Sequence, residues 1–509
     1  MSHFGSFGRD RRGNVAMLFA LAIIPLVGMV GAAIDYSRVA HVRTELADVL
    51  DAAVLSVGSR PAMTDKQAYD AVREWVDAHM AATAWTLDSV SQIDGRIIAS
   101  ASADVDMTIA RILGVDQVPV SIQSEAVRSL GKIELVMVLD NTGSMKGKKI
   151  ATLRDAADKL VDSLAAAAAR PGDLRVGLVP FSQTVNVGPR YGNAAWIDAA
   201  GRSTSAKNLF LGQEVNRFGL FAALGTEWGG CVETRAMPWE ASGAPPDPAR
   251  PDTLYVPYFA PDEPGGKGSR PYNNSYLDDR PLAQILRSLG LSSATAPLFQ
   301  YQQGDPFKYS GRPYNGKTGA FGYEYGPNSG CEMAPLHRLS TDTAAVKKAI
   351  GAMIANGNTD IPVGLAWGGN VLSPEGPFGD GAPYGDSEWT KTVVLMTDGN
   401  NENAEGNDRD ESYYSGVGYV WQGRMGITSG SKSRRTAIRD ARLGEMCAAM
   451  KAKGVVIYTV RVEVRNGSSS VLEDCASDAD KFYDVQNIAD LVAVFDDIGG
   501  SIKRLRLAR

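Results

Sequence analysis

The sequence is poor in the features that mark nucleic-acid binders and zinc proteins. Among 509 residues, 52 Lys and Arg stand against 58 Asp and Glu, a net charge of -6, with no long run of one charge. A nucleic-acid binder normally presents a basic surface, so no nucleic-acid partner is expected. The chain has only four histidines and four cysteines, and no two cysteines are spaced as CxxC, so it offers no zinc motif.

The longest stretch without charge lies near the N-terminus, at residues 15–34 (VAMLFALAIIPLVGMVGAAI). As a helix it would span roughly 30 Å, the thickness of the hydrocarbon core of a bilayer. Arg9, Arg11 and Arg12 precede it, which favours a cytoplasmic N-terminus. We therefore predict a cytoplasmic tail at 1–14, one transmembrane helix in the inner membrane, and an exported remainder that is periplasmic or extracellular.

Two other interpretations of this stretch remain open. The small residues in VGMVGAAID would suit a cleaved signal peptide, and a buried core helix would also be apolar. The run is longer than the core of a usual signal peptide, which favours the anchor. Both the anchor and the signal peptide would export the rest of the chain.

Beyond this stretch the pattern predicts a small module. Apolar residues recur at helical spacing to about Ser56 and again from Thr64 to Met80. The segments RIIASASADVDMTIARILG and VPVSIQSEAV then alternate apolar and polar residues, as half-buried strands do. We expect residues 35–130 to form a helical stalk with a small α+β module.

Short, continuous apolar runs mark the next part of the chain. They are IELVMVL at 133–139, LRVGLVPF at 174–181, TVVLMT at 392–397 and VVIYTVRV at 455–462. Such runs suit parallel strands that are buried on both faces. With amphipathic helices between the first two runs and before the last, they predict a doubly wound, mostly parallel α/β sheet within residues 131–501.

Two segments interrupt this alternation and are interpreted as irregular insertions. Residues 186–339 are rich in Pro, Gly, Tyr and Trp with little periodicity, and residues 400–432 form the smaller insertion. The aromatic residues of the first could line a binding surface. Residues 502–509 are expected to form a basic C-terminal tail.

The four cysteines are expected to form disulfides, because export permits oxidation. Four cysteines allow three connectivities. Cys231 and Cys331 both lie in the first insertion, whereas Cys447 and Cys475 flank the last predicted strand. We therefore predict the pairs Cys231–Cys331 and Cys447–Cys475.

Oxygen-bearing side chains follow the predicted strands at the points where the strands end. These residues are Asp140, Thr142 and Ser144 in DNTGS, Thr359 before a predicted helix, and Asp398 in TDG. In an open parallel sheet, ligands bind beyond the carboxyl ends of the strands, so these side chains should meet. Two carboxylates and three hydroxyls make a hard site that suits Mg²⁺, or else Mn²⁺ or Ca²⁺.

The same residues have two simpler interpretations. Asp and Thr could cap a helix that begins near Lys146, although capping would not explain Thr359 and Asp398. A nucleophilic Ser144 would need a base, and only His337 could approach it. We therefore expect no catalytic residue and no enzymatic activity.

Two family resemblances rest on these motifs. The segment RRGNVAMLFALAIIPLVGMVGAAIDYSRVAHVRTELADVLDAAVL resembles the N-terminal segment of the TadE/TadG-like proteins of Tad (Flp) pilus assembly. Prepilin-like members carry a glutamate five residues after the processing glycine, whereas Leu18 holds that position after Gly13, which favours the uncleaved, TadG-like branch. DNTGS, Thr359 and TDG together resemble the metal-ion-dependent adhesion site of a von Willebrand factor A domain, over about 132–186 and 339–501.

The second resemblance implies that the three hydroxyl residues are ligands and that the two aspartates bind the ion directly or through water. An open position on the ion would take a carboxylate from a protein partner. Together the resemblances imply a membrane-anchored pilus-assembly component with an exported, metal-dependent protein-binding domain and partners among pilus-assembly proteins. The alternatives are an adhesion module unrelated to pili and a subunit of a cytosolic, ATP-driven chelatase-type assembly, which the anchor disfavours.

Overall fold

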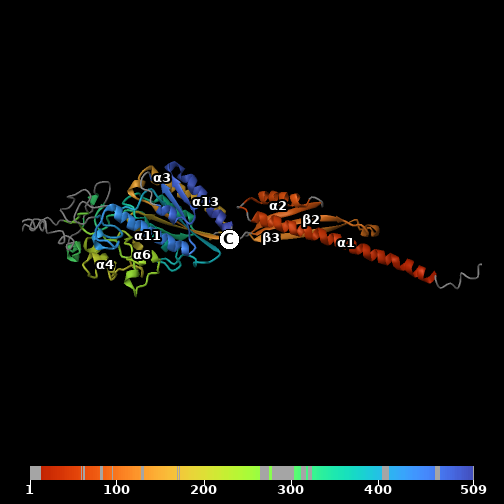
Figure 1. Ribbon diagram of the computed structural model, residues 1–509, viewed down its shortest axis with the longest axis horizontal. Helices are drawn as coiled ribbons and strands as arrows, with labels where there is room; N and C mark the ends of the chain where they lie inside the picture. The colour runs from red at the N-terminus through yellow and green to blue at the C-terminus, as the bar shows by residue number, and fades with distance from the viewer. Residues whose placement is uncertain are drawn as a thin grey trace, which may run out of the picture. The chain divides into compact units, whose positions relative to one another are not determined.

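The computed structural model divides into two compact units, Met1–Leu130 (unit 1) and Gly131–Arg509 (unit 2) (Figure 1). It describes residues 13–58, 60, 63–80, 84–93, 96–127, 131–168, 170, 172–263, 274–277, 303–310, 314, 317–318, 324–403, 412–464 and 470–507. The described residues therefore include only 13–14 of the predicted tail at 1–14 and 502–507 of the predicted tail at 502–509, and much of the first insertion lies outside them.

Unit 1 is built from two helices and a three-stranded antiparallel sheet. Its elements are α1 (Gly13–Gly58), α2 (Asp65–His79), β1 (Trp85–Ile93), β2 (Arg96–Asp106), the 3-10 helix η1 (Ala110–Leu113) and β3 (Gln117–Val127), with the strands in the order β1-β2-β3. Burial alternates along β2 because only one face of the sheet packs against the helices. The predicted apolar and amphipathic helices form one continuous helix, α1, which passes through Pro25.

The central sheet of unit 2 has six strands in the order β10-β5-β4-β11-β12-β13. The strands are β4 (Lys132–Asp140), β5 (Leu174–Phe181), β10 (His337–Ser340), β11 (Trp389–Thr397), β12 (Val456–Val462) and β13 (Phe482–Val485). All neighbours are parallel except β10, which is antiparallel to β5. The mostly parallel α/β sheet expected from the sequence is therefore present. However, β10 is part of it, so the first insertion ends before His337 rather than at 339.

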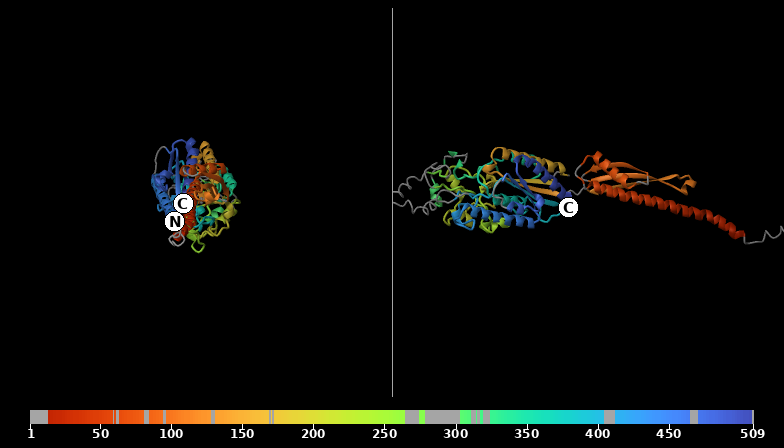
Figure 2. Two further views of the ribbon diagram at one scale, coloured as in Figure 1. Left: turned by 90° about the vertical axis from the view of Figure 1, so that its right-hand side faces the viewer. Right: turned by 45° about the horizontal axis from the view of Figure 1, so that its top comes forward.

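Helices pack on both faces of this sheet (Figures 1 and 2). They are α3 (Lys148–Ala167), α9 (Thr343–Gly351) and α13 (Leu491–Leu507) on one face, and α10 (Ile361–Leu372), α11 (Lys432–Ala452) and α12 (Val471–Cys475) on the other. In β4, Leu135 and Met137 face the first group, and Val136 and Val138 face the second. Both faces are therefore dry, which explains the continuous apolar run in the sequence.

The first insertion is folded against the α10 side of the sheet. Its described elements are β6 (Val185–Asn186), α4 (Thr204–Leu209), α5 (Arg217–Ala223), β7 (Cys231–Val232), α6 (Trp239–Ser242), β8 (Lys317–Thr318) and β9 (Glu324–Tyr325). The ring centroids of Trp196 and Tyr255 lie 5.9 and 4.6 Å from that of Trp367 in α10. These aromatic residues are part of the core, so the alternative that the aromatic residues line a binding surface does not hold for them.

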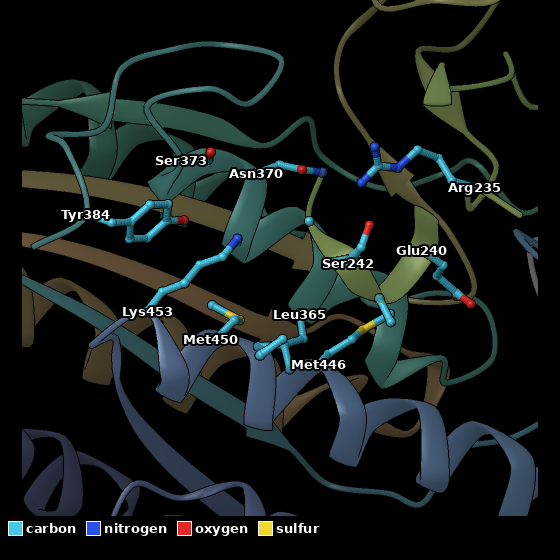
Figure 3. Close-up of a pocket in the computed structure, with 15 residues that line it drawn as sticks. Arg235, Glu240, Ser242, Leu365, Asn370, Ser373, Tyr384, Met446, Met450 and Lys453 are labelled. Atoms are coloured by element: carbon cyan, nitrogen blue, oxygen red, sulfur yellow. The ribbon is translucent and has the colours of Figure 1, made fainter. Parts of the chain in front are cut away.

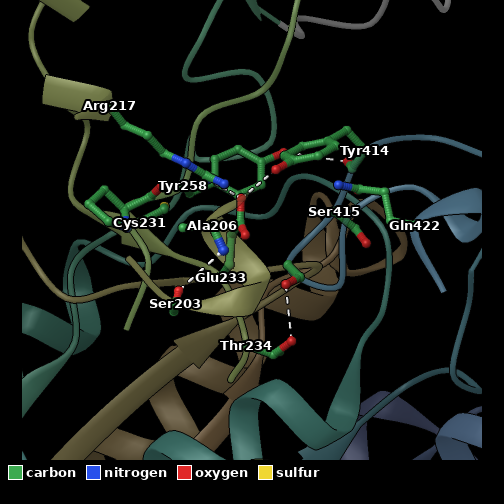
Figure 4. Close-up of polar contacts among 12 residues, drawn as sticks. Ser203, Ala206, Arg217, Cys231, Glu233, Thr234, Tyr258, Tyr414, Ser415 and Gln422 are labelled. Atoms are coloured by element: carbon green, nitrogen blue, oxygen red, sulfur yellow. Dashed lines mark hydrogen bonds and ion pairs between the residues drawn. The ribbon is translucent and has the colours of Figure 1, made fainter. Parts of the chain in front are cut away.

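A buried polar cluster joins the two insertions (Figure 4). The carboxylate of Glu233, in the first insertion, accepts hydrogen bonds from Arg217 and from Tyr414 and Arg424 of the second. All four side chains are at most 5% exposed. The carbonyl oxygen of Gly416 accepts a hydrogen bond from the N–H of Thr234, and the N–H of Gly416 donates to the carbonyl oxygen of Gln183. These bonds connect both insertions to the segment that follows β5.

Both predicted disulfides are present. Cys231 is bonded to Cys331 within the first insertion, and Cys447 of α11 is bonded to Cys475 of α12. No cysteine is free.

Candidate metal centre

The register of the sheet brings the two predicted aspartates to one edge. Strands β4 and β11 are parallel neighbours, and Leu139 pairs with Met396. Asp140, the last residue of β4, and Asp398, the residue directly after β11, therefore lie at the carboxyl ends of two adjacent strands, close to the same position along them. On the other side of β4, Asp140 pairs with Phe181, so Ser182 leaves β5 at the same edge.

Hydrogen bonds connect four of the five predicted residues. The Oδ1 of Asp140 accepts from the backbone N–H of Thr142 at 2.7 Å, and its Oδ2 accepts from the hydroxyl of Thr397 at 2.6 Å. The hydroxyl oxygens of Thr142 and Ser144 are 2.9 Å apart. Ser144 then donates to Oδ1 of Asp398 at 2.6 Å, which closes the connection between the two strand ends.

The fifth residue, Thr359, lies in the loop before α10. This loop is held against the first one, because the N–H of Gly143 donates to the carbonyl of Gly357 at 2.9 Å. A Cβ atom built on Gly399 would lie 3.6 Å from Oγ1 of Thr359, so the threonine hydroxyl adjoins the loop after β11. Three segments far apart in the sequence thus bring all five residues to one place.

Helix capping does not account for the DNTGS loop. Helix α3 begins at Lys148 with Gly147 as its N-cap, and no side chain makes a cap bond there. Thr142 precedes only a three-residue 3-10 helix, Gly143–Met145, and its side chain makes no cap bond to it. The alternative that these residues simply cap a helix near Lys146 is therefore wrong.

The electrostatics of the loop disfavour a negative charge on Asp140. Asp140 is fully buried. Burial, and then the negative charge of Asp398, raise the pKa of Asp140 to about 6, although hydrogen bonds from Thr142 and Thr397 oppose this rise. Two close carboxylates are each stabilised in the charged form by a nearby positive charge.

One positive charge at the site was not found by sequence reasoning. The Nζ of Lys149 donates to Oδ2 of Asp398 at 2.7 Å and lies 3.5 Å from the carboxylate of Glu463. It balances Asp398 but makes no contact with Asp140 among the described interactions. Lys149 is the second residue of α3, and nothing in its spacing reveals this pairing.

Two further residues at the site, Asn141 and Ser182, were also missed. Both are buried, and within the described part of the chain the amide atoms of Asn141 and the hydroxyl of Ser182 have no hydrogen-bond partner. Buried polar atoms of this kind normally bond water or a ligand. Ser182 directly follows the run LRVGLVPF, as Asp140 follows IELVMVL, so the same strand-end rule could have found it.

The donor set is one of hydroxyls and carboxylates. No group of three or more His, Cys, Asp or Glu side chains is placed to hold a metal anywhere in the described residues. Hydroxyl and carboxylate oxygens fit a hard ion such as Mg²⁺ better than zinc. Ser144 is exposed while Asp140 and Thr142 are buried, so solvent reaches the cluster from the Ser144 side.

The arrangement does not suit nucleophilic catalysis by Ser144. His337 lies opposite Leu178 on the edge strand β10, and β5 separates it from β4. Its Nδ1 is 2.8 Å from the carbonyl oxygen of Arg338. The hydroxyl of Ser144 instead donates to a carboxylate that is already paired with a lysine.

A separate hollow lies between α6, α10 and α11 (Figure 3). Leu365, Met446 and Met450 form its apolar floor, and Arg235 and Lys453 lie at its sides. None of the five predicted site residues lines it. It therefore has no part in the candidate centre.

The N-terminal segment matches a known family. Residues 13–60 match the model of the Tad family, described as "Putative Flp pilus-assembly TadE/G-like". This match covers the whole of α1 and the two residues after it, and it supports a pilus-related protein. A search of curated proteins finds no match.

Solved structures with detectable similarity include pilus proteins. The vWF domain of the type V pili tip protein Mfa5 from Porphyromonas gingivalis is 11% identical, with 73% of this chain and 95% of that chain covered and a TM-score of 0.32. The adhesive tip pilin GBS104 from Group B Streptococcus agalactiae is 10% identical (74% and 100% covered, TM-score 0.33). The pilus adhesin SpaC from Lactobacillus rhamnosus GG is 11% identical (TM-score 0.33), and the match covers 82% of this chain but only 34% of SpaC. At such TM-scores no role is transferred from these proteins.

Proposed function

We propose that unit 2 is a von Willebrand factor A-type domain with a doubly wound sheet that binds one divalent cation, such as Mg²⁺, and through it a carboxylate of a protein partner. The observation that carries this proposal is the convergence of five oxygen side chains from three separate segments at one edge of a parallel sheet. Such an edge is where ligands bind in open α/β sheets.

The residues have distinct roles in this proposal. Thr142, Ser144 and Thr359 offer neutral hydroxyl oxygens, and Asp140 and Asp398 hold the ion directly or through water. Because Lys149 balances the charge of Asp398, the protein contributes little net negative charge. The ion, when bound, supplies residual positive charge and an open position that attracts a partner's carboxylate oxygen.

The same proposal places the chain in a membrane. Within the described residues, α1 alone is long and apolar enough to cross a bilayer. Its most apolar 18-residue segment has a mean hydropathy of 2.2, and only 11% of that segment is buried. We propose that α1 anchors a TadG-like component of a Tad pilus system in the inner membrane, with the part of unit 1 beyond the apolar stretch and all of unit 2 exported. The family match at 13–60 and two disulfides in unit 2 support this topology.

The metal proposal is tested by calorimetric titration of the full chain in nanodiscs with Mg²⁺ and Mn²⁺. Asp140→Ala should weaken binding by at least about 100-fold, since even residues behind the ligands typically contribute 10- to 100-fold. Thr142→Ala should weaken it less, because water can replace one hydroxyl. Asp155→Ala, on the exposed side of α3, is the matched control and should bind as the wild type does.

Equal affinity of the wild type and Asp140→Ala for Mg²⁺ would contradict the assignment of the metal site. Circular dichroism must show that the variant is folded. If it is not, Ser144→Ala replaces it, because Ser144 is exposed and its loss leaves no buried charge. The pilus assignment is tested separately, by crosslinking in intact cells and identification of the captured partners, and it fails if no pilus-assembly protein is recovered.

A further inference from the structure

The turn between β2 and β3 of unit 1 carries large apolar side chains in the open. Ile112 is 78% exposed, Leu113 84% and Val115 45%. Turns are normally made of Gly, Pro, Asn, Asp and Ser, and adjacent exposed aliphatic residues usually mark an interaction site. We call residues 107–116 the hairpin tip.

The hairpin tip is fixed to helix α1. The carboxylate of Asp35, only 4% exposed, accepts hydrogen bonds from the backbone N–H groups of three consecutive residues, Thr108, Ile109 and Ala110, at 2.7 to 2.9 Å. The guanidinium of Arg38 also donates to the hydroxyl of Thr108 at 2.6 Å. These bonds satisfy the charge of Asp35 and hold the turn at one level of the helix.

The contact between the hairpin tip and α1 extends into the end of the apolar stretch. A Cβ on Gly31 would lie 2.5 Å from side-chain carbons of Ile109, so the glycine permits close contact between the helix and the hairpin tip. Gly31 precedes the end of the stretch at Ile34 by three residues, or roughly 4.5 Å of helix. The polar headgroup layer on each side of a bilayer is about 5–7 Å thick, so a membrane that encloses the whole stretch must reach the hairpin tip.

The polar residues at this level suit the surface of a membrane. Tyr36 is 76% exposed, one residue beyond Asp35. The side chain of Arg111, beside Ile112, is 71% exposed and pairs with the equally exposed Asp116, at 3.1 Å. Tyrosine is enriched at membrane interfaces, and arginine near a helix end extends toward the headgroups.

We infer that the hairpin tip is a second membrane contact, with Ile112 and Leu113 inserted among the phospholipids of the bilayer that α1 crosses. The inference rests on the proposed membrane anchor and adds a partner, lipid, for this exposed apolar surface. The apolar surface of α1 is continuous with it through the Gly31–Ile109 contact. Two contacts would fix the orientation of unit 1 on the membrane, whereas a helix alone leaves it free to tilt and rotate.

Fluorescence quenching tests this inference on the full chain in phosphatidylethanolamine and phosphatidylglycerol nanodiscs. Because all four native cysteines are in disulfides, a thiol-reactive dye labels only an introduced cysteine. Leu113→Cys reports on the hairpin tip and Val27→Cys, 55% exposed, on the apolar stretch. Ile93→Cys is the matched control, because Ile93 is also apolar and 58% exposed. It lies at the end of β1 and pairs with the first residue of β2, whereas the hairpin tip follows the last residue of β2.

With nitroxide-labelled lipids, the dyes at 27 and 113 should both lose most of their emission, and the dye at 93 should keep it. Quenching at 27 alone, with position 113 behaving like position 93, would overturn the inference and leave the anchor standing. A dye at 113 that is shielded from water but not quenched would also overturn it, since protein would then cover the tip. Quenching at neither 27 nor 113 would refute the anchor itself.

Discussion

Unit 1 has an antiparallel sheet and unit 2 a mostly parallel one, and this difference decides where the exposed apolar residues of unit 1 and the clustered oxygen-bearing residues of unit 2 lie. In unit 1 each strand pairs with its neighbour in sequence, and one sheet face is dry. In unit 2 the strands pair across long separations, and both faces are dry. Unit 1 therefore presents its unusual residues at a hairpin turn, whereas unit 2 collects residues 254 positions apart, Ser144 and Asp398, at the ends of parallel strands.

The units also differ in how they hold charge. The ion pairs of unit 1, such as Arg96–Glu125, are largely exposed. In unit 2, Glu134 with Lys391 and Glu233 with Arg217 and Arg424 are almost fully buried. Removal of one partner should therefore cost little in unit 1 and much in unit 2. The predictions below exploit these contrasts, from the largest expected effect to the smallest.

Loss of the long disulfide should affect unit 2 alone. The Cys231–Cys331 bond closes a loop of 100 residues, and such a bond stabilises the folded state by about 4–5 kcal/mol in the chain-entropy model. The double variant Cys231→Ser/Cys331→Ser should lower the unfolding temperature of unit 2 in calorimetry, while the transition of unit 1, which has no cysteine, stays in place. Equal shifts of both transitions would contradict the independence of the units.

The buried carboxylate at the centre of Figure 4 should be nearly as important. Glu233→Ala leaves Arg217 and Arg424 buried without their counter-charge, and breaking a buried pair in this way typically costs about 3–5 kcal/mol. Glu125→Ala, which removes the exposed partner of Arg96, should cost less than about 1 kcal/mol. Urea unfolding of both variants measures the difference, and similar losses would show that burial is not what distinguishes the two pairs.

Within unit 1, two glycines of α1 offer a matched pair. Gly31→Ala places a methyl group against Ile109 and should cost about 1–3 kcal/mol of the helix–hairpin contact, whereas nothing lies within 4 Å of a Cβ on Gly28. Hydrogen exchange should become faster at the amides of Thr108 to Ala110 in Gly31→Ala and stay unchanged in Gly28→Ala. Unchanged exchange in both would mean that Asp35 alone holds the hairpin tip.

The smallest expected effect concerns the charge that competes with the proposed cation. Lys149→Ala removes a positive charge that is paired with Asp398, so cation affinity should rise several-fold, by about 1 kcal/mol. Lys148→Ala, an exposed neighbour at the start of α3, is the control and should change the affinity less. Titration with Mg²⁺ compares the two. A loss of affinity in Lys149→Ala would show that the lysine positions Asp398 rather than competing with the ion.

Much of the fold followed from local pattern. The continuous runs at 133–139, 174–181, 392–397 and 455–462 predicted the four central strands, because a strand buried on both faces needs apolar residues at every position. The edge strands β10 and β13 were missed, since four-residue strands with charged and polar members, such as HRLS, carry no such signal. The disulfide pairs followed from which segment holds each cysteine.

The sequence by itself determined which side chains stand at the strand ends, because the end of an apolar run marks that position. It also determined the apolar length of α1. Only the tertiary structure decided which of these ends adjoin, that Lys149 and Ser182 join the cluster, and that Asp35 holds a turn more than seventy residues away. Strand order, register and loop docking arise from packing between distant segments, and no local periodicity encodes them.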